Sequence, residues 1–103
     1  MDVMEAIRKR YSCRAYQSRP VEEEKLEQIL EAARLAPSAR NLQDWRFVVI
    51  ADQQIRNQLK AAARNQAFVR QAPVVIAACS TVPDLMQCGQ PVGPIDVAIA
   101  LEH

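Results

Sequence analysis

Arginine and serine side chains follow closely on one another after a short predicted N-terminal helix. Arg10 and Arg14 flank Ser12 within a five-residue stretch. A guanidinium group is a permanently charged planar fork that suits phosphate oxygens, and a serine hydroxyl adds a further hydrogen bond. The spacing is typical of an anion-binding clamp. Composition alone favours a plainer interpretation, in which residues 8–19, with five basic side chains and no carboxylate, form a solvated basic face.

A second polar cluster lies in the segment 38–44, between a predicted helix and a predicted strand. Ser38 and Asn41 both donate and accept hydrogen bonds, as a polar ligand would require. The same residue types are common in any turn after a helix, so turn chemistry stays open as the alternative. Gln66, at the end of another predicted helix, has the same two interpretations.

Several kinds of chemistry are excluded by what the chain lacks. Its single histidine, His103, is the last residue, so no Ser-His-Asp or Cys-His arrangement can be assembled. Cys13, Cys79 and Cys88 form no CxxC pair, and one histidine cannot complete a zinc site with them. We therefore assign no catalytic side chain and no metal ligand, and expect the cysteines to be reduced.

Length and charge restrict the remaining classes. The 103 residues are 50% hydrophobic and 24% charged, which fits one domain with one core. The net charge of +1 lacks the field of a nucleic-acid binder, although an RNA site confined to residues 8–19 would be a third possibility. The longest apolar run, Val74–Cys79, is far shorter than the roughly 20 residues that span a bilayer. With no secretory signal at the N-terminus, we expect a cytoplasmic protein without membrane association.

The elements that must position these residues alternate between helices and strands. Asp2 and Glu5 form a capping box for a helix that runs to about Lys9, and a second helix follows Pro20 and stops before Pro37. Two buried strands are predicted at residues 47–51 and 74–79, with Trp45 and Phe47 as core anchors. Between them, Asp52 caps a third helix that continues towards residues 68–69. After an irregular loop at residues 86–94, Asp96 caps a helix over residues 97–103.

Three segments together resemble the N-terminal portion of the FMN-dependent nitroreductase family. They are Arg-Lys-Arg-Tyr-Ser-Cys-Arg-Ala-Tyr at 8–16, Ala-Pro-Ser-Ala-Arg-Asn-Leu-Gln-Asp-Trp-Arg-Phe at 36–47, and Asn-Gln-Ala-Phe-Val at 65–69 followed by Ala-Pro-Val-Val-Ile at 72–76. Their order and spacing agree with the family along the whole chain. Asp44 departs from it, because the family usually has proline there. The chain also ends before the family's glycine-containing segment near the flavin and its C-terminal basic residues.

The resemblance implies an α+β fold with helices around a central, mostly antiparallel sheet, here truncated, with residues 1–103 as the N-terminal part of a single nitroreductase-like domain. It implies FMN as cofactor, NADH or NADPH as electron donor, and reduction of nitroaromatics, quinones or similar small-molecule acceptors by a homodimer. Dehalogenases and a flavin-cleaving enzyme share this start. The alternative is a non-catalytic flavin-binding or interaction module that a partner chain completes.

The resemblance also implies which residues bind the cofactor. Arg10 and Ser12 would hold the phosphate and ribityl end, and Arg14 would reach towards the pyrimidine edge of the ring. Tyr11, within the same segment, is a further cofactor-binding residue. Pro37, Ser38, Ala39 and Asn41 would approach the flavin of the neighbouring subunit, and Gln66 would touch its polar edge. We expect Arg10→Ala to weaken FMN binding more than tenfold, with Arg56→Ala as the variant that leaves it unchanged.

Overall fold

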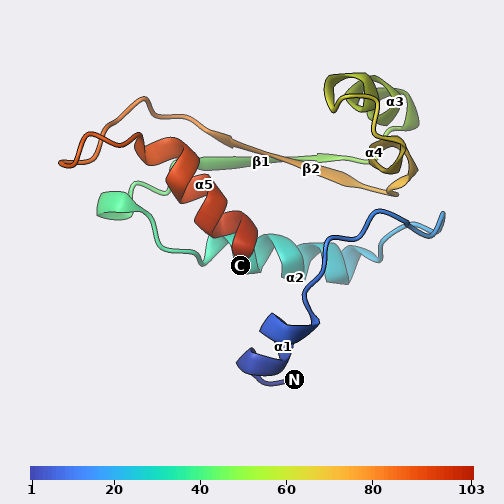
Figure 1. The fold of residues 1–103 in the computed structure, drawn as a ribbon, viewed down its shortest axis with the longest axis horizontal. Coiled ribbons are helices and arrows are strands. Elements are labelled where there is room, and N and C mark those ends of the chain that lie inside the picture. The colour runs from blue at the N-terminus through green and yellow to red at the C-terminus, as the bar shows by residue number, and fades with distance from the viewer.

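A two-stranded antiparallel sheet is the centre of the fold, with α2 and α5 packed on one of its faces (Figure 1). The computed structural model describes residues 1–103. In chain order the elements are α1 (Val3–Lys9), α2 (Glu23–Arg34), the 3-10 turn η1 (Ala39–Asn41), β1 (Trp45–Ile50), α3 (Gln53–Ala62), α4 (Ala67–Gln71), β2 (Val75–Ser80) and α5 (Val92–Glu102). The predicted α+β class and antiparallel pairing are confirmed.

Small side chains let the two helices approach the sheet closely. The core consists of Trp45 with Ala33, Ala36 and Ala100, and Phe47 packs against it. Trp45 is only 6% exposed, which confirms it as the core anchor at the entrance of β1. Alanines on α2 and α5 leave room for the indole ring, so the beginning of β1 is held more firmly than its end.

The opposite face of the sheet has little cover, and the prediction of two fully buried strands is wrong. Side chains alternate along a strand, so Val48 lies on the face away from Trp45 and Phe47. Val48 is 52% exposed, and even Val49 on the helix side is 40% exposed. Apolar side chains on both faces are typical of a strand with a layer above and below it. Within this chain only one layer is present.

The helix boundaries follow local backbone signals, and two predictions need correction. Asp2 accepts a hydrogen bond from Glu5 N at 2.7 Å, so the predicted first cap is confirmed. The third helix does not continue to residues 68–69, because Arg64 and Asn65 adopt positive φ angles that end it and separate α3 from α4. Asp96 is not a cap either. α5 already begins at Val92, after Pro91, so Asp96 lies inside it.

The strand limits shift by one or two residues. β1 begins at Trp45 and ends at Ile50, where residues 47–51 were predicted, and β2 covers Val75–Ser80, where residues 74–79 were predicted. In the pairing, Trp45 lies opposite Ser80 and Ile50 lies opposite Val75. The register therefore places the polar end of β2 beside the buried start of β1.

The molecule is more open than a compact domain of its size. Its radius of gyration is 15.4 Å, against about 13 Å for a compact chain of this length. Its accessible surface of 7911 Å² compares with about 5,800 Å² expected from its mass. No hydrogen bond joins residues 1–21 to the rest of the chain. None of the helices combines the length and apolarity that crossing a lipid bilayer requires.

Candidate functional site

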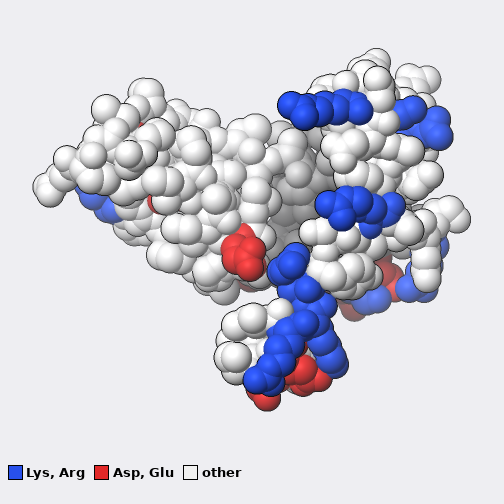
Figure 2. Space-filling model, in the orientation of Figure 1, with Lys and Arg blue, Asp and Glu red and all other residues white.

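The basic segment, residues 8–19, carries guanidinium groups that have no carboxylate partner. Lys9 pairs with Glu5 on α1, whereas neither Arg10 nor Arg14 forms an ion pair. The only hydrogen bond from the Arg14 side chain goes to the carbonyl of Ser12, at the long distance of 3.5 Å. Basic side chains dominate the visible surface of α1 and the segment after it (Figure 2). Both guanidinium groups are exposed and free to bind an anion.

The chain between these arginines turns locally around Cys13. The Tyr16 hydroxyl donates to the Cys13 carbonyl at 2.9 Å, and the Cys13 thiol lies 3.1 Å from the Ala15 carbonyl. A side-chain hydrogen bond with Cys13 raises the pKa of Tyr11 above its ordinary value, and a neutral phenol can donate a hydrogen bond. Tyr11 and Ser12 are both exposed beside the arginines.

The polar loop, residues 38–44, has a defined conformation. Arg40, Asn41 and Gln43 adopt positive φ angles, near 50°, and asparagine tolerates this region better than most residues. The Ser38 hydroxyl accepts from Gln43 N at 2.9 Å, and the Asn41 side-chain oxygen accepts from Gln43 Nε2 at 3.1 Å. The amide nitrogen of Asn41 is left to donate outward from an exposed side chain.

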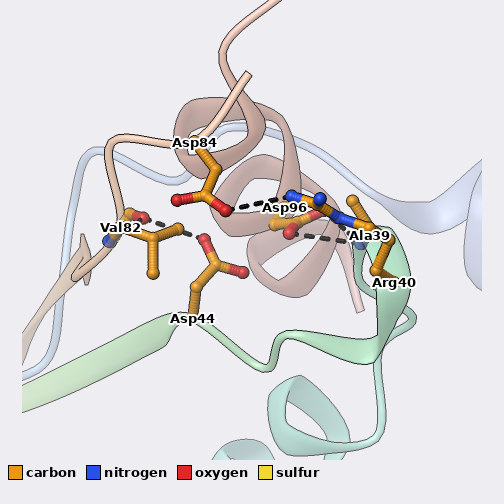
Figure 3. Close-up of polar contacts among 7 residues, drawn as sticks. Ala39, Arg40, Asp44, Val82, Asp84 and Asp96 are labelled. Carbon is orange, nitrogen blue, oxygen red and sulfur yellow. Dashed lines mark hydrogen bonds and ion pairs between the residues drawn. The ribbon is translucent and has the colours of Figure 1, made fainter. Parts of the chain in front are cut away.

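Behind this loop lies an acidic cluster that the sequence analysis missed (Figure 3). Asp96 of α5 accepts from Ala39 N, at 3.1 Å to Oδ1 and 3.3 Å to Oδ2. Asp44 Oδ2 accepts from the Ser80 hydroxyl at 2.8 Å. On the exposed side, Arg40 pairs with Asp84 at 3.0 Å. The departure of Asp44 from the family's proline was the one sequence signal that pointed here.

Burial and a shared contact shift the pKa values of the two buried carboxyls in opposite directions. Burial, and then a hydrogen bond with Asp44, raise the pKa of Asp96. Burial also acts to raise the pKa of Asp44, but hydrogen bonds from Asp96 and Ser80 outweigh it and lower that pKa. Of the two carboxyls, Asp96 therefore keeps its proton to higher pH.

A single copy does not bring all the predicted site residues together. η1, with Ala39 and Asn41, lies at one end of the long axis and α4 near the other (Figure 1). Gln66 occupies the N-cap position of α4, where its side chain is exposed and donates to the Ala63 carbonyl at 3.0 Å. No hydrogen bond connects the basic segment, the polar loop and Gln66 with one another.

The main apolar groove of the molecule lies away from the predicted site residues, whereas a smaller cavity touches one of them. A groove of about 410 Å³ runs between α2, the sheet and the end of α5, and its lining includes Ile29, Phe47 and Leu101. A smaller cavity of about 210 Å³ touches Ala39 and Arg40 of the polar loop. The larger groove contains none of the predicted site residues, and its apolar lining is typical of an uncovered core.

Comparison with known proteins gives one consistent answer. Residues 7–91 match the model described as the Nitroreductase family. A Thermus thermophilus protein named NADH dehydrogenase is 45% identical over 86 residues, which are 84% of this chain and 42% of that protein. A nitroreductase family protein from Clostridium novyi NT has a TM-score of 0.90 at 26% identity, over 100% of this chain and 61% of that one. The NADPH:FMN oxidoreductase of Vibrio harveyi, solved with NAD+, has a TM-score of 0.85 at 26% identity, over 96% and 47%. The chain spans about half the length of these relatives.

Proposed function

This chain belongs to the nitroreductase family, and from that premise we propose that it is part of an FMN-dependent NAD(P)H oxidoreductase. When bound, FMN supplies hydride transfer from NADH or NADPH to a small acceptor such as a nitroaromatic or a quinone. The observation that carries the proposal is the pair of guanidinium groups on Arg10 and Arg14, which are exposed and lack carboxylate partners.

The donors of the basic segment fit the phosphate and ribityl end of FMN. A phosphate dianion needs several charged donors, and Arg10 and Arg14 supply planar forks with Ser12 between them. Tyr11 adds a neutral phenol on the same exposed stretch. Because Arg14 is permanently charged, a position near the pyrimidine edge of the ring would favour the anionic reduced flavin.

We further propose that the functional unit is a homodimer in which the polar loop of one copy meets the basic segment of the other. The separation of the candidate residues within one copy supports this arrangement, as does the excess accessible surface. Pro37 and Asn41 are exposed, so they are accessible to a second chain, with Ser38 and Ala39 half-buried beside them. Gln66 would contribute one further polar contact.

The energy available from one copy agrees with a shared site. Two hydrogen bonds from charged groups and one neutral bond contribute roughly 4–7 kcal/mol before any ordering cost. Micromolar affinity requires about 8 kcal/mol. The remaining contacts would come from the second copy and from the part of the relatives that this chain does not cover.

Flavin titration tests the proposal. We expect Arg10→Ala to weaken FMN binding more than tenfold, measured by quenching of flavin fluorescence. Arg56→Ala is unsuitable as the matched control, because Arg56 is buried and structural. Arg70 is an exposed arginine on α4 that forms no ion pair, so Arg70→Ala replaces it. Equal losses in the two variants would refute the role of Arg10.

A second measurement separates an enzyme from a binding module. With bound FMN, NADH should bleach the flavin absorbance, and a nitroaromatic acceptor should restore it. A non-catalytic flavin-binding or interaction module would bind FMN without this cycle. Binding without bleaching would therefore favour the module and contradict the oxidoreductase.

A further inference from the structure

Two buried aspartates meet behind the polar loop, where four segments of the chain converge (Figure 3). Asp44 directly precedes β1 and Asp96 lies inside α5, and each is only 2% exposed. Ser80 at the end of β2 donates to one oxygen of Asp44, and Ala39 N of η1 donates to Asp96. The pair thus connects the loop to both strands and to the last helix.

One oxygen of this pair has no donor if both aspartates are ionised. Asp44 Oδ1 is buried and lacks a hydrogen-bond partner among all other groups of the protein. A buried acceptor left unpaired is costly, and two adjacent buried carboxylates repel each other strongly. A proton on Asp96 removes both problems, because its O–H can then donate to the Asp44 carboxylate, with which Asp96 is in hydrogen-bond contact.

The charged groups around the pair do not replace that proton. Arg46, on β1, acts on Asp44 only through its charge and directs its guanidinium to the carbonyls of Gln43 and Trp45. Arg40, on η1, is engaged with Asp84 on the exposed side. Neither arginine donates to a buried carboxyl, so the pair depends on its own proton.

We propose that Asp44 and Asp96 share a single proton in the folded protein, and that this protonated pair is a positioning device for the polar loop. Asp96 fixes Ala39 N, which sets the course of the chain through Asn41. The link to cofactor binding rests on the proposed function, whereas the shared proton does not. Arg40 contributes an exposed ion pair on the other side of the loop.

The pH dependence follows from the directions of the two shifts. The raised pKa of Asp96 adds stability that is fully present below the ordinary aspartate pKa and is lost as pH rises through the folded value. The lowered pKa of Asp44 adds stability that is present above the ordinary value and is lost as pH falls through the folded one. The pair therefore contributes most near the ordinary value, about 3.9, and its contribution falls on both sides.

Side-chain carboxyl NMR of the chain, titrated from acid to neutral pH, tests the shared proton directly. We expect Asp44 to titrate below and Asp96 above the ordinary aspartate range, each responding to the other's titration. Finding that Asp96 titrates at or below the ordinary aspartate value, or that the two titrations are independent of each other, would overturn the proposal.

The variant Asp96→Asn tests whether the proton does the positioning. The amide can donate to Asp44 and accept from Ala39 N without titrating. We expect it to keep the slow amide exchange of Ala39 and to remove the loss of unfolding free energy above pH 4 that Asp96 causes. Asp52→Asn is the matched control and should leave that loss unchanged. An equal loss in wild type and Asp96→Asn would contradict the proposal.

Flavin affinity then distinguishes this proposal from the proposed function. Asp96→Asn should bind FMN within about threefold of wild type, and Asp96→Ala, which removes the contact to Ala39 N, should bind more than tenfold more weakly. If the wild-type protein shares the proton but binds no FMN, the proposed function is refuted and the shared proton of Asp44 and Asp96 is still supported. If Asp96→Ala binds as well as wild type, the positioning role is refuted. Should Asp96→Ala fail to fold, the exchange rate of Ala39 in Asp96→Asn still decides the question.

Discussion

Replacement of Arg56 by alanine should remove a large part of the stability of the α3–α4 unit. The Arg56 side chain donates to the carbonyls of Ala51 at 3.2 Å and Arg70 at 3.0 Å, and also to the carbonyl of Ala72. A further bond at 2.9 Å reaches Gln53 on its own helix. The guanidinium thus satisfies carbonyls at the end of α4 that have no partner within that helix.

The expected loss is about 3–5 kcal/mol. A hydrogen bond from a charged group contributes roughly 1.5–3 kcal/mol to stability. Arg56→Ala removes such bonds from three carbonyls, and water that enters the vacated space would hydrogen-bond to them and offset part of the loss. Small domains are stable by only about 5–15 kcal/mol, so this loss would be severe. Arg56→Lys should recover only part of it, because an ammonium group is a single point and cannot reach carbonyls in three directions.

Urea unfolding followed by circular dichroism measures the loss, and amide exchange locates it. α4 has five residues, fewer than an isolated helix needs, so its amides should lose protection first. The exposed Arg70 gives the control variant Arg70→Ala, expected to change the unfolding free energy by less than about 0.5 kcal/mol. Similar losses in Arg56→Ala and Arg70→Ala would refute the reasoning.

Two further substitutions give informative changes in thermal or urea unfolding. Alanine in place of glycine inside a helix usually stabilises it by about 0.5–1 kcal/mol. Gly93→Ala should instead destabilise the protein by about 1–3 kcal/mol, because the new Cβ would lie 2.4 Å from Ser80 Oγ. A stabilised variant would show that α5 moves away from β2 freely. Asp52→Ala should lower the unfolding free energy by about 0.5–2 kcal/mol, because it removes the oxygen that accepts from Ile55 N at the start of α3. Asp52→Asn keeps an acceptor oxygen and should lower it little. Equal losses in the two variants would show that the cap oxygen is not responsible.

The sequence predicted those parts of the fold that depend on local signals. The Asp2 and Asp52 caps and the helix stop before Pro37 involve neighbouring residues, and the structure has them where the pattern placed them. The left-handed turn at Arg64 and Asn65 escaped prediction, because neither residue type requires a positive φ angle. The apolar strands predicted a fully covered sheet, whereas the helices of this chain cover only one of its faces.

The candidate site was predictable only for residues that belong to a recognisable sequence motif. Arg10, Ser12 and Arg14 stood out through charge and spacing, and their role as cofactor ligands stays a prediction. Asp96 was misread because an aspartate before an apolar helical run is typical of an N-cap. Its contact with Ala39 joins residues 57 positions apart in the sequence, which no local pattern reveals. The structural role of Arg56 gives no local signal either, because two of its carbonyl partners lie 14 and 16 positions away in the sequence.

The narrow sheet has a consequence for how the protein behaves in solution. Each strand has a single neighbour, so the outward-facing amides and carbonyls along both rims of the ribbon have no strand to pair with. Such rims are templates for strands from other molecules. Pairing between the sheets of two molecules of this chain should therefore increase with protein concentration.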